Sequence, residues 1–284
     1  MSTSVTSTTA STSNPAITSK DVIEFRKANL AFSGLVSNRY RDEAKVGTTI
    51  RWSLSTLVNS GAARTKAEGN SGNDITFDVN TEGAVQLTIN QWMYSAWELE
   101  EFEESLSIVD LKKWQTRNAA YVLDTSIDDT LAALVDDFSQ VEGTLAVDNT
   151  DTEIRRAVQY LDDANAPDAD RYFVMSPATT NAMLAIDRYA SSDFNKGGGV
   201  NIVRGTFGEI YGLKAVRSTN VEGSNAAGHD NGIFQKDALA MAMRMKPKVR
   251  KFDDILNLSE QHAISAIWGV IETRDDHGVF LRGA

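Results

Sequence analysis

The sequence predicts an α+β fold in which two strand-rich ends flank a helical middle. From Thr48 onwards apolar and polar residues alternate, which is typical of half-buried strands. Between Glu103 and Gln140 apolar residues follow a single stripe at helical spacing, with few helix breakers. Strand-like apolar runs return near the C-terminus, at 264–271 and 279–281. The chain is therefore expected to leave one layer of the fold and later return to it.

The first segment, residues 1–19, carries no charged side chain and is dominated by Ser and Thr. It has neither the basic start nor the apolar run of a secretory signal. Such a segment buries too little surface to offset its own ordering entropy. It is expected to be either disordered or an arm that lies along a neighbouring molecule. A short helix is predicted over 21–40, with a break near Gly34.

Residues 45–95 are predicted to form a long β-ribbon. Its strands are indicated by alternating runs at 48–54, 75–79 and 85–89, and the polar segment 59–73 is predicted to be a loop at the tip. The sequence Asn-Thr-Glu-Gly-Ala at 80–84 predicts a hairpin connection. Because an isolated ribbon is marginally stable in water, a partner subunit is expected to cover it.

The helical stripe predicts one long helix from Glu103 to Gln140, on the order of 50 Å at 1.5 Å per residue. Gly143 is expected to end it. A second amphipathic helix is predicted over 151–163, with its apolar residues on one face. A later apolar segment, 238–245, is expected to stop at Pro247.

The stretch from Asp170 to Asn220 predicts a strand, a helix, a loop and a second strand. Tyr172–Met175 is a compact apolar run, after which Ser176 suits a helix N-cap and Pro177 the first helical position. Glycines follow at 197–199, 205, 208 and 212, and a strand is predicted over 213–220.

These glycines do not match a phosphate-binding loop. Their spacing differs from the dinucleotide and Walker patterns, and a strand rather than a helix follows Gly212. Gly205–Gly208 formally matches a Gly-x-x-Gly nucleic-acid clamp, but its flanks are not markedly basic. We interpret the glycines as turn residues that permit positive φ and close backbone approach.

Composition narrows the classes of function. The net charge of -11 argues against a protein that grips nucleic acid through a clustered basic surface, although not against one that encloses it. The absence of cysteine excludes disulfides, thiolate nucleophiles and Cys-ligated metals. No apolar run approaches the length of a membrane span, so no membrane partner is expected.

The histidines offer little chemistry. His229, His262 and His277 are the only three, and none lies in a His-Glu-x-x-His motif or beside a plausible nucleophile. A metal site is conceivable at His229-Asp230 or at 275–277, but such pairs in polar loops are more often solvated surface.

Asp124, Asp128 and Asp129 lie on one face of the predicted long helix and are compatible with a divalent-cation site. The alternative is a solvated or subunit-facing surface paired to the bases Lys112, Lys113 and Arg117. We favour the surface interpretation, because no second carboxylate cluster or phosphate-gripping loop accompanies the three aspartates. With no nucleophile, base and orienting group in one motif, the sequence predicts no enzyme, no catalytic residues, no cofactor and no metal.

Four segments resemble a known family in their sequence, order and spacing. They are Thr88-Ile89-Asn90-Gln91-Trp92-Met93-Tyr94 with the acidic run behind it; Asp110-Leu111 with Ala119-Ala120 and Leu123-Asp124 to Asp128; Arg171-Tyr172-Phe173-Val174-Met175-Ser176-Pro177; and Gly205 to Asn220. They resemble the major capsid protein of tailed bacteriophages, the Hong Kong 97-like fold. In that family they correspond to the exit from an extended loop, a spine helix, the central strand of an axial domain, and its return strand. The resemblance covers about residues 20–284.

The resemblance implies assembly rather than catalysis. Copies of the chain would form pentamers and hexamers that tile an icosahedral head, assembled in the bacterial host cytoplasm and enclosing double-stranded DNA. The implied partners are further copies, a scaffolding protein, a portal, a possible decoration protein and the packaged DNA, in non-specific contact. An acidic wall suits a shell that must not hold DNA too tightly.

The resemblance also divides the chain. The expected parts are an N-terminal arm (1–44), an extended loop (45–97), a spine helix with the peripheral domain (98–146), an axial domain (147–234) and a return to the sheets (235–284). Two alternatives remain open: an encapsulin-like protein shell of the same fold, and a metal-dependent α/β enzyme that uses Asp124 and Asp128.

Overall fold

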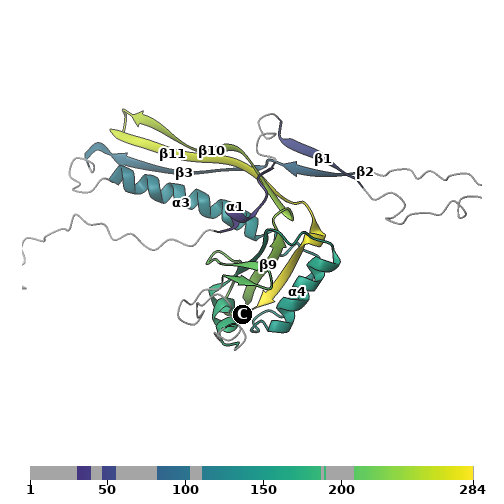
Figure 1. Cartoon of the computed structure of the whole chain (residues 1–284). Coiled ribbons are helices and arrows are strands. Elements are labelled where there is room, and N and C mark those ends of the chain that lie inside the picture. The colour runs from purple at the N-terminus through teal and green to yellow at the C-terminus, as the bar shows by residue number, and fades with distance from the viewer. Residues whose placement is uncertain are drawn as a thin grey trace, which may run out of the picture.

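The computed structural model describes residues 31–39, 47–55, 82–102, 111–186, 189 and 208–283. The protein has a long lobe, built on a three-stranded sheet, and a compact lobe, built on a seven-stranded sheet (Figure 1). A pair of strands, β1 and β2, lies at the junction and points away from both lobes (Figure 1). The mixed α+β composition predicted from the sequence is confirmed.

The long sheet consists of β10 (Leu239–Asp254), β11 (Ser259–Glu272) and β3 (Gln91–Glu100), all antiparallel in the order β10-β11-β3. The helix α3 (Leu111–Ala132) lies along one face of it (Figure 1). Ala119 and Leu123 of the helix pack there against Ile264 of β11. Two strands longer than 13 residues therefore have a helical backing for much of their length.

The predicted long helix ends earlier than expected, at Ala132 instead of Gln140. Beyond it the chain turns, with Leu134 N–H donating to Leu131 (3.3 Å) and Val135 N–H to Ala132 (3.0 Å). The apolar stripe continues because Val135 and Phe138 enter the same core from a turn. Gly143 does not end the helix: it lies in β4 (Val141–Gly143) with φ of 81°. The proposed start, 103–110, lies outside the described residues.

The ribbon is confirmed in part. Strand β1 (Thr49–Ser55) pairs antiparallel with β2 (Glu82–Thr88). The hairpin predicted at 80–84 is wrong, because Gly83 pairs with Leu54 and Ala84 with Ser53 inside the ladder. A local turn signal was outweighed by pairing with a strand distant in sequence. The predicted strand at 75–79 and loop at 59–73 lie outside the described residues.

The compact lobe is centred on β5 (Arg171–Met175), which is buried throughout. It pairs in parallel with β7 (Leu213–Arg217) and antiparallel with β9 (Gly228–Gln235). The sheet order is β4-β12-β9-β5-β7-β6, where β12 is Gly278–Gly283, β6 is Glu209–Ile210, and β8 (Gly223–Ser224) pairs with β9. Burial on both faces explains the continuous apolar run of β5.

Two helices cover this sheet as predicted. Helix α4 (Asp151–Asp163) begins with a capping box formed by Thr150 and Glu153. Helix α5 (Pro177–Leu184) begins at Ser176, whose hydroxyl accepts a hydrogen bond from Thr179 N–H at 3.0 Å. Both N-caps satisfy backbone donors that the helix leaves unpaired.

The turn before β7 confirms the interpretation of one glycine. Gly212 has φ of 77°, in the left-handed region that favours glycine. The strand that follows it ends at Arg217, short of the predicted Asn220. Residues 190–207, with the glycines at 197–199 and 205, lie outside the described residues.

The apolar segment was predicted to end at Pro247. This prediction is wrong, because β10 continues through Pro247 to Asp254. Proline has no N–H to donate, but β10 is an edge strand of the long sheet, and the isolated bridge on its other side, from Ser37 to Ala240, lies well before Pro247. Register shifts between Met243 and Met245, and between Met245 and Lys248, absorb the irregularity.

The two lobes share one apolar core at their junction. Of the helix predicted over 21–40, the described residues form only the short helix α1 (Phe32–Leu35), which contains Gly34 and inserts Phe32 there. The ring of Phe32 stacks on Phe234 of β9 with centroids 6.4 Å apart, and Trp268 of β11 belongs to the same cluster. The chain crosses between lobes from β9 to β10 and again from β11 to β12, through the short helix η4 (Asp275–His277).

Candidate assembly surface

The three aspartates of the predicted long helix do not form a site. Asp128 is fully buried, and its two carboxylate oxygens accept hydrogen bonds from Ala31 N–H and Ser33 N–H, each at 3.1 Å. Burial raises the pKa of Asp128, while these hydrogen bonds lower it. Asp129 accepts a hydrogen bond from Asn220 at 2.6 Å. Asp128 is thus neither a metal ligand nor a solvated residue: it fixes the start of α1 on α3.

Burial also raises the pKa of Asp124, the third aspartate. Lys112, one of the expected partner bases, pairs instead with Glu260. Within the described ranges, no group of three or more His, Asp or Glu side chains is arranged to hold a metal ion.

The histidines lie in three separate settings. His229 Nε2 is 3.0 Å from Asn225 Oδ1 at the start of β9. His262 on β11 stacks on Trp97 of β3, with ring centroids 5.2 Å apart. His277 is buried at the junction, where burial lowers its pKa. In the part of the chain that the structure describes, none of the three meets a nucleophile and an orienting group.

What distinguishes the long lobe is a set of exposed apolar residues at its end. The turn between β10 and β11 carries Ile255 and Leu256, which are 85% and 94% exposed, together with Leu258. Phe252 of β10 is also exposed. We call these four residues the apolar tip. Contiguous exposed apolar residues of this kind mark interaction surfaces in soluble proteins.

Ion pairs join the strands behind the apolar tip to α3. Glu260, the second residue of β11, lies 2.8 Å from Lys112 Nζ of α3 and 2.9 Å from Lys251 Nζ of β10. Hydrogen bonds from these two lysines lower the pKa of Glu260 to about 2. The carboxylate therefore stays charged at neutral pH and joins the helix to two strands at the end of the lobe.

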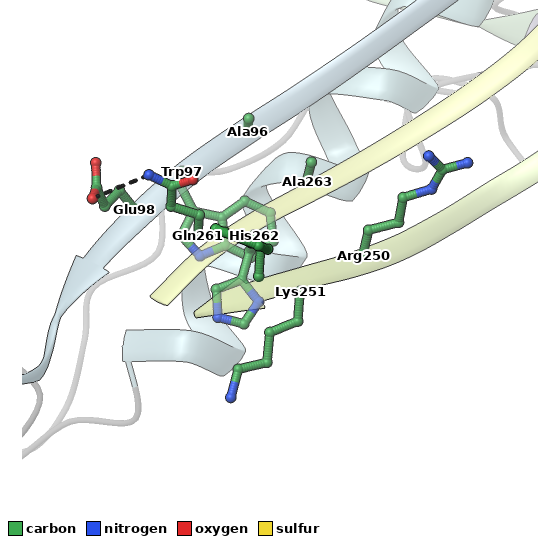
Figure 2. A pocket seen from close by; sticks show the side chains of 9 residues that line it. Ala96, Trp97, Glu98, Arg250, Lys251, Gln261, His262 and Ala263 are labelled. Carbon is green, nitrogen blue, oxygen red and sulfur yellow. Dashed lines mark hydrogen bonds between the residues drawn. The ribbon is translucent and has the colours of Figure 1, made fainter. Parts of the chain in front are cut away.

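The sheet face opposite α3 is also open beyond the ribbon, from the start of β3 onwards. Met93 and Trp97 pack toward α3, so the alternate residues Trp92 and Tyr94 face away from it, and they are 72% and 73% exposed. Next to them lies a hollow of about 570 Å³ with Ala96 and Ala263 among its lining residues (Figure 2). Phe252 is another lining residue. Arg250, Gln261 and Glu98 also line the hollow, and Gln261 donates a hydrogen bond to Glu98 (Figure 2).

Nearer the junction, the same face is covered by the ribbon. Ile50 and Leu87 pack against Ala240 and Ala242 of β10. A Cβ atom on Gly269 of β11 would lie 2.4 Å from the carbonyl oxygen of Thr88, so only glycine permits this approach. The base of the ribbon is thus seated on its own subunit.

Sequence and structure comparisons give different results. No family model matches the sequence, and no curated protein matches it either. A chain of Mycobacterium phage Che8 superposes with a TM-score of 0.83 at 21% identity, covering 94% of this chain and 96% of that one. This protein has the phage capsid fold.

Other capsids share the fold. The capsid of Cyanophage P-SCSP1u matches with a TM-score of 0.76 at 15% identity, over 95% of this chain and 93% of that chain. The mature capsid of bacteriophage PhiM1 matches with a TM-score of 0.71 at 15% identity, over 95% of this chain and 91% of that chain. The resemblance stated from sequence is confirmed at the level of the capsid fold.

Sequence reasoning missed the apolar tip. The signal was present, since Ile255-Leu256-Asn257-Leu258 is unusually apolar for a turn between two strands. Trp92 and Tyr94, which the resemblance placed at the exit from the ribbon, begin β3 of the long sheet. Among the helices that the structure describes, none combines the length and apolar character of a membrane span.

Proposed function

We propose that this protein is the major capsid protein of a tailed phage, a structural subunit without catalytic activity. The observation that carries the proposal is that the capsid fold extends over more than nine-tenths of the chain and of its structural neighbours. The open apolar surfaces give that fold a physical reason to associate. Leaving Ile255, Leu256 and Trp92 in water forgoes about 1.5–3 kcal/mol of burial for each side chain.

The proposed assembly is a closed icosahedral shell of pentamers and hexamers around double-stranded DNA. Its partners are further copies of the chain, a scaffolding protein, a portal and a possible decoration protein, and its location is the virion after assembly in the host cytoplasm. The net charge of -11 supports a wall that encloses DNA without binding it tightly.

Electron microscopy of the purified full-length chain tests the proposal. The chain is expressed alone and together with the scaffolding protein from the same source, and particles are imaged after purification. Closed shells of uniform size are expected. Monomers and small oligomers under all conditions would overturn the proposal, and shells that hold protein cargo without DNA would favour an encapsulin-like compartment instead.

A further inference from the structure

The two edges of the long sheet carry opposite charge. Strand β10 holds five basic residues between Arg244 and Lys251 and no acidic one before Asp253, in a chain whose net charge is -11. All five are exposed. Because β10 is an edge strand, this positive charge lines one side of the sheet.

Three of these cations are available to a partner. Lys251 is paired with Glu260 and Asp253, at 2.9 and 3.2 Å, and Arg244 donates to the carbonyl of Gly47 at 2.9 Å. The other three form no ion pair or hydrogen bond with any residue that the structure describes. We call them the basic edge: Lys246, Lys248 and Arg250.

The opposite edge of the same sheet is acidic. Strand β3 ends with Glu98 and Glu100, and Glu101 follows. Glu98 accepts hydrogen bonds from Ser259 and Gln261. The carboxylates of Glu100 and Glu101 have no hydrogen-bond or ion-pair partner among the described residues. We call these three residues of the β3 side the acidic edge.

Each edge also presents apolar surface. Val249 and Phe252 are exposed along the basic edge, and Trp92 and Tyr94 lie on β3. Aromatic residues with a few charges at the margin are typical of a protein–protein interface. A surface that contacts only phosphates has no use for exposed aromatic side chains of this kind.

We propose that the basic edge of one subunit docks against the acidic edge of a neighbouring copy, with Phe252 meeting Trp92 and Tyr94. The contact joins two different surfaces, so it repeats from copy to copy and closes into a ring or shell when its angle allows. This inference rests on the proposed capsid function and specifies one of its contacts. It also gives the free cations of an acidic protein a matching partner.

Charge reversal tests the contact. One variant carries Lys248→Glu with Arg250→Glu, a second carries Glu100→Lys with Glu101→Lys, and a third carries all four changes. Each double variant places like charges opposite each other, which costs several kcal/mol, so its critical concentration for assembly should rise about tenfold or more. The fourfold variant exchanges the two signs and should assemble as the unchanged chain does. Light scattering and electron microscopy measure assembly, and circular dichroism checks folding.

A matched control separates pairing from net charge. Lys248→Glu with Arg250→Glu is combined with Asp148→Lys and Asp163→Lys on the compact lobe, where both aspartates are exposed. This variant has the net charge of the unchanged chain but no matching edges, and it should not assemble. Assembly in this control would overturn the proposal.

The remaining outcomes distinguish the two levels of inference. If the unchanged chain forms shells and both double variants also form them at the same concentration, only the edge contact is overturned. If the unchanged chain stays monomeric throughout, the capsid function and the contact both fail. If Lys248→Glu with Arg250→Glu assembles normally but loses binding to a labelled DNA duplex, the basic edge is a DNA contact and the proposal is wrong.

Discussion

At the scale of single residues, the junction between the lobes holds a pair of carboxyl groups. Glu272, the last residue of β11, lies beside Asp275, whose Oδ1 accepts a hydrogen bond from Ser139 N–H at 2.7 Å. Burial, followed by the charge of Asp275, raises the pKa of Glu272 to about 7. Asp137 adds to the same effect. A proton on Glu272 thus reduces repulsion where β11, η4 and the turn after α3 meet.

The raised pKa predicts a pH dependence of stability. The contribution of Glu272 to the free energy of unfolding is fully present below its ordinary pKa of 4.5 and is lost as the pH rises through about 7. Glu272→Gln removes this dependence, so the stability of the variant relative to the unchanged chain should increase between pH 5 and pH 8, a window of about 3 units. Denaturant unfolding of the subunit across that range measures it. The exposed Glu101→Gln is the control, and parallel curves for Glu272→Gln and the unchanged chain would contradict the prediction.

At the scale of elements, the seat of the ribbon depends on the contact between Gly269 and Thr88. Gly269→Ala forces a methyl group against the Thr88 carbonyl, and overpacking of this kind typically costs about 1–3 kcal/mol. The variant should exchange the amide hydrogen of Ile89, which donates to Thr48 at 2.8 Å, faster than the unchanged chain. Hydrogen exchange measured by NMR or mass spectrometry gives the result.

Gly34→Ala is the matched control for that change. A Cβ atom at Gly34 has no neighbour within 4 Å and its φ is not positive, and alanine suits a helix better than glycine. The free energy of unfolding of the Gly34→Ala variant should equal or slightly exceed that of the unchanged chain. Equal exchange of Ile89 in both variants would show that the ribbon does not depend on the close approach at Gly269.

Elements were predictable from the sequence where local pattern and tertiary environment agree. The strands predicted at 172–175, 264–271 and 279–281 lie within β5, β11 and β12, and the helix predicted at 151–163 matches α4. The early end of α3 did not, because Val135 and Phe138 keep the apolar spacing of a helix while the backbone turns. The break predicted at Pro247 was wrong for a related reason. Proline is tolerated in an edge strand such as β10, and only the sheet order shows that β10 is one.

The candidate surface was less predictable than the fold. The ribbon was expected to be an intersubunit contact, but the apolar tip and the two charged edges were not. Net charge averages over the chain, whereas the sheet order places one strand, β11, between Lys248 and Arg250 on one edge and Glu100 on the other. The sequence shows both charge runs, but only the fold shows that they line opposite sides of one surface.

At the scale of the whole molecule, the apolar tip predicts that folding and assembly can be separated. Ile255 and Leu256 are almost fully exposed, so Ile255→Asp with Leu256→Asp should leave the melting temperature of the subunit nearly unchanged. Shell formation should be lost, because buried unpaired carboxylates are strongly unfavourable at an interface. Sedimentation velocity and electron microscopy measure the loss. Val147→Asp on the compact lobe, at another exposed apolar residue, is the comparison, and normal shells from the double variant would contradict the prediction.

Because β10 is long, a small rotation at the junction core moves the far end of the long lobe by a large distance. Sixteen residues at about 3.3 Å each span about 50 Å, from the shared core at Leu239 to the turn that carries Ile255. A rotation of about 5° at the core would move the far end by about 4–5 Å, roughly the spacing of two strands. Slight repacking around Phe32 and Phe234 is therefore enough to re-aim the apolar tip by a full strand width. The subunit can in this way meet neighbours at several angles while its two sheets stay intact.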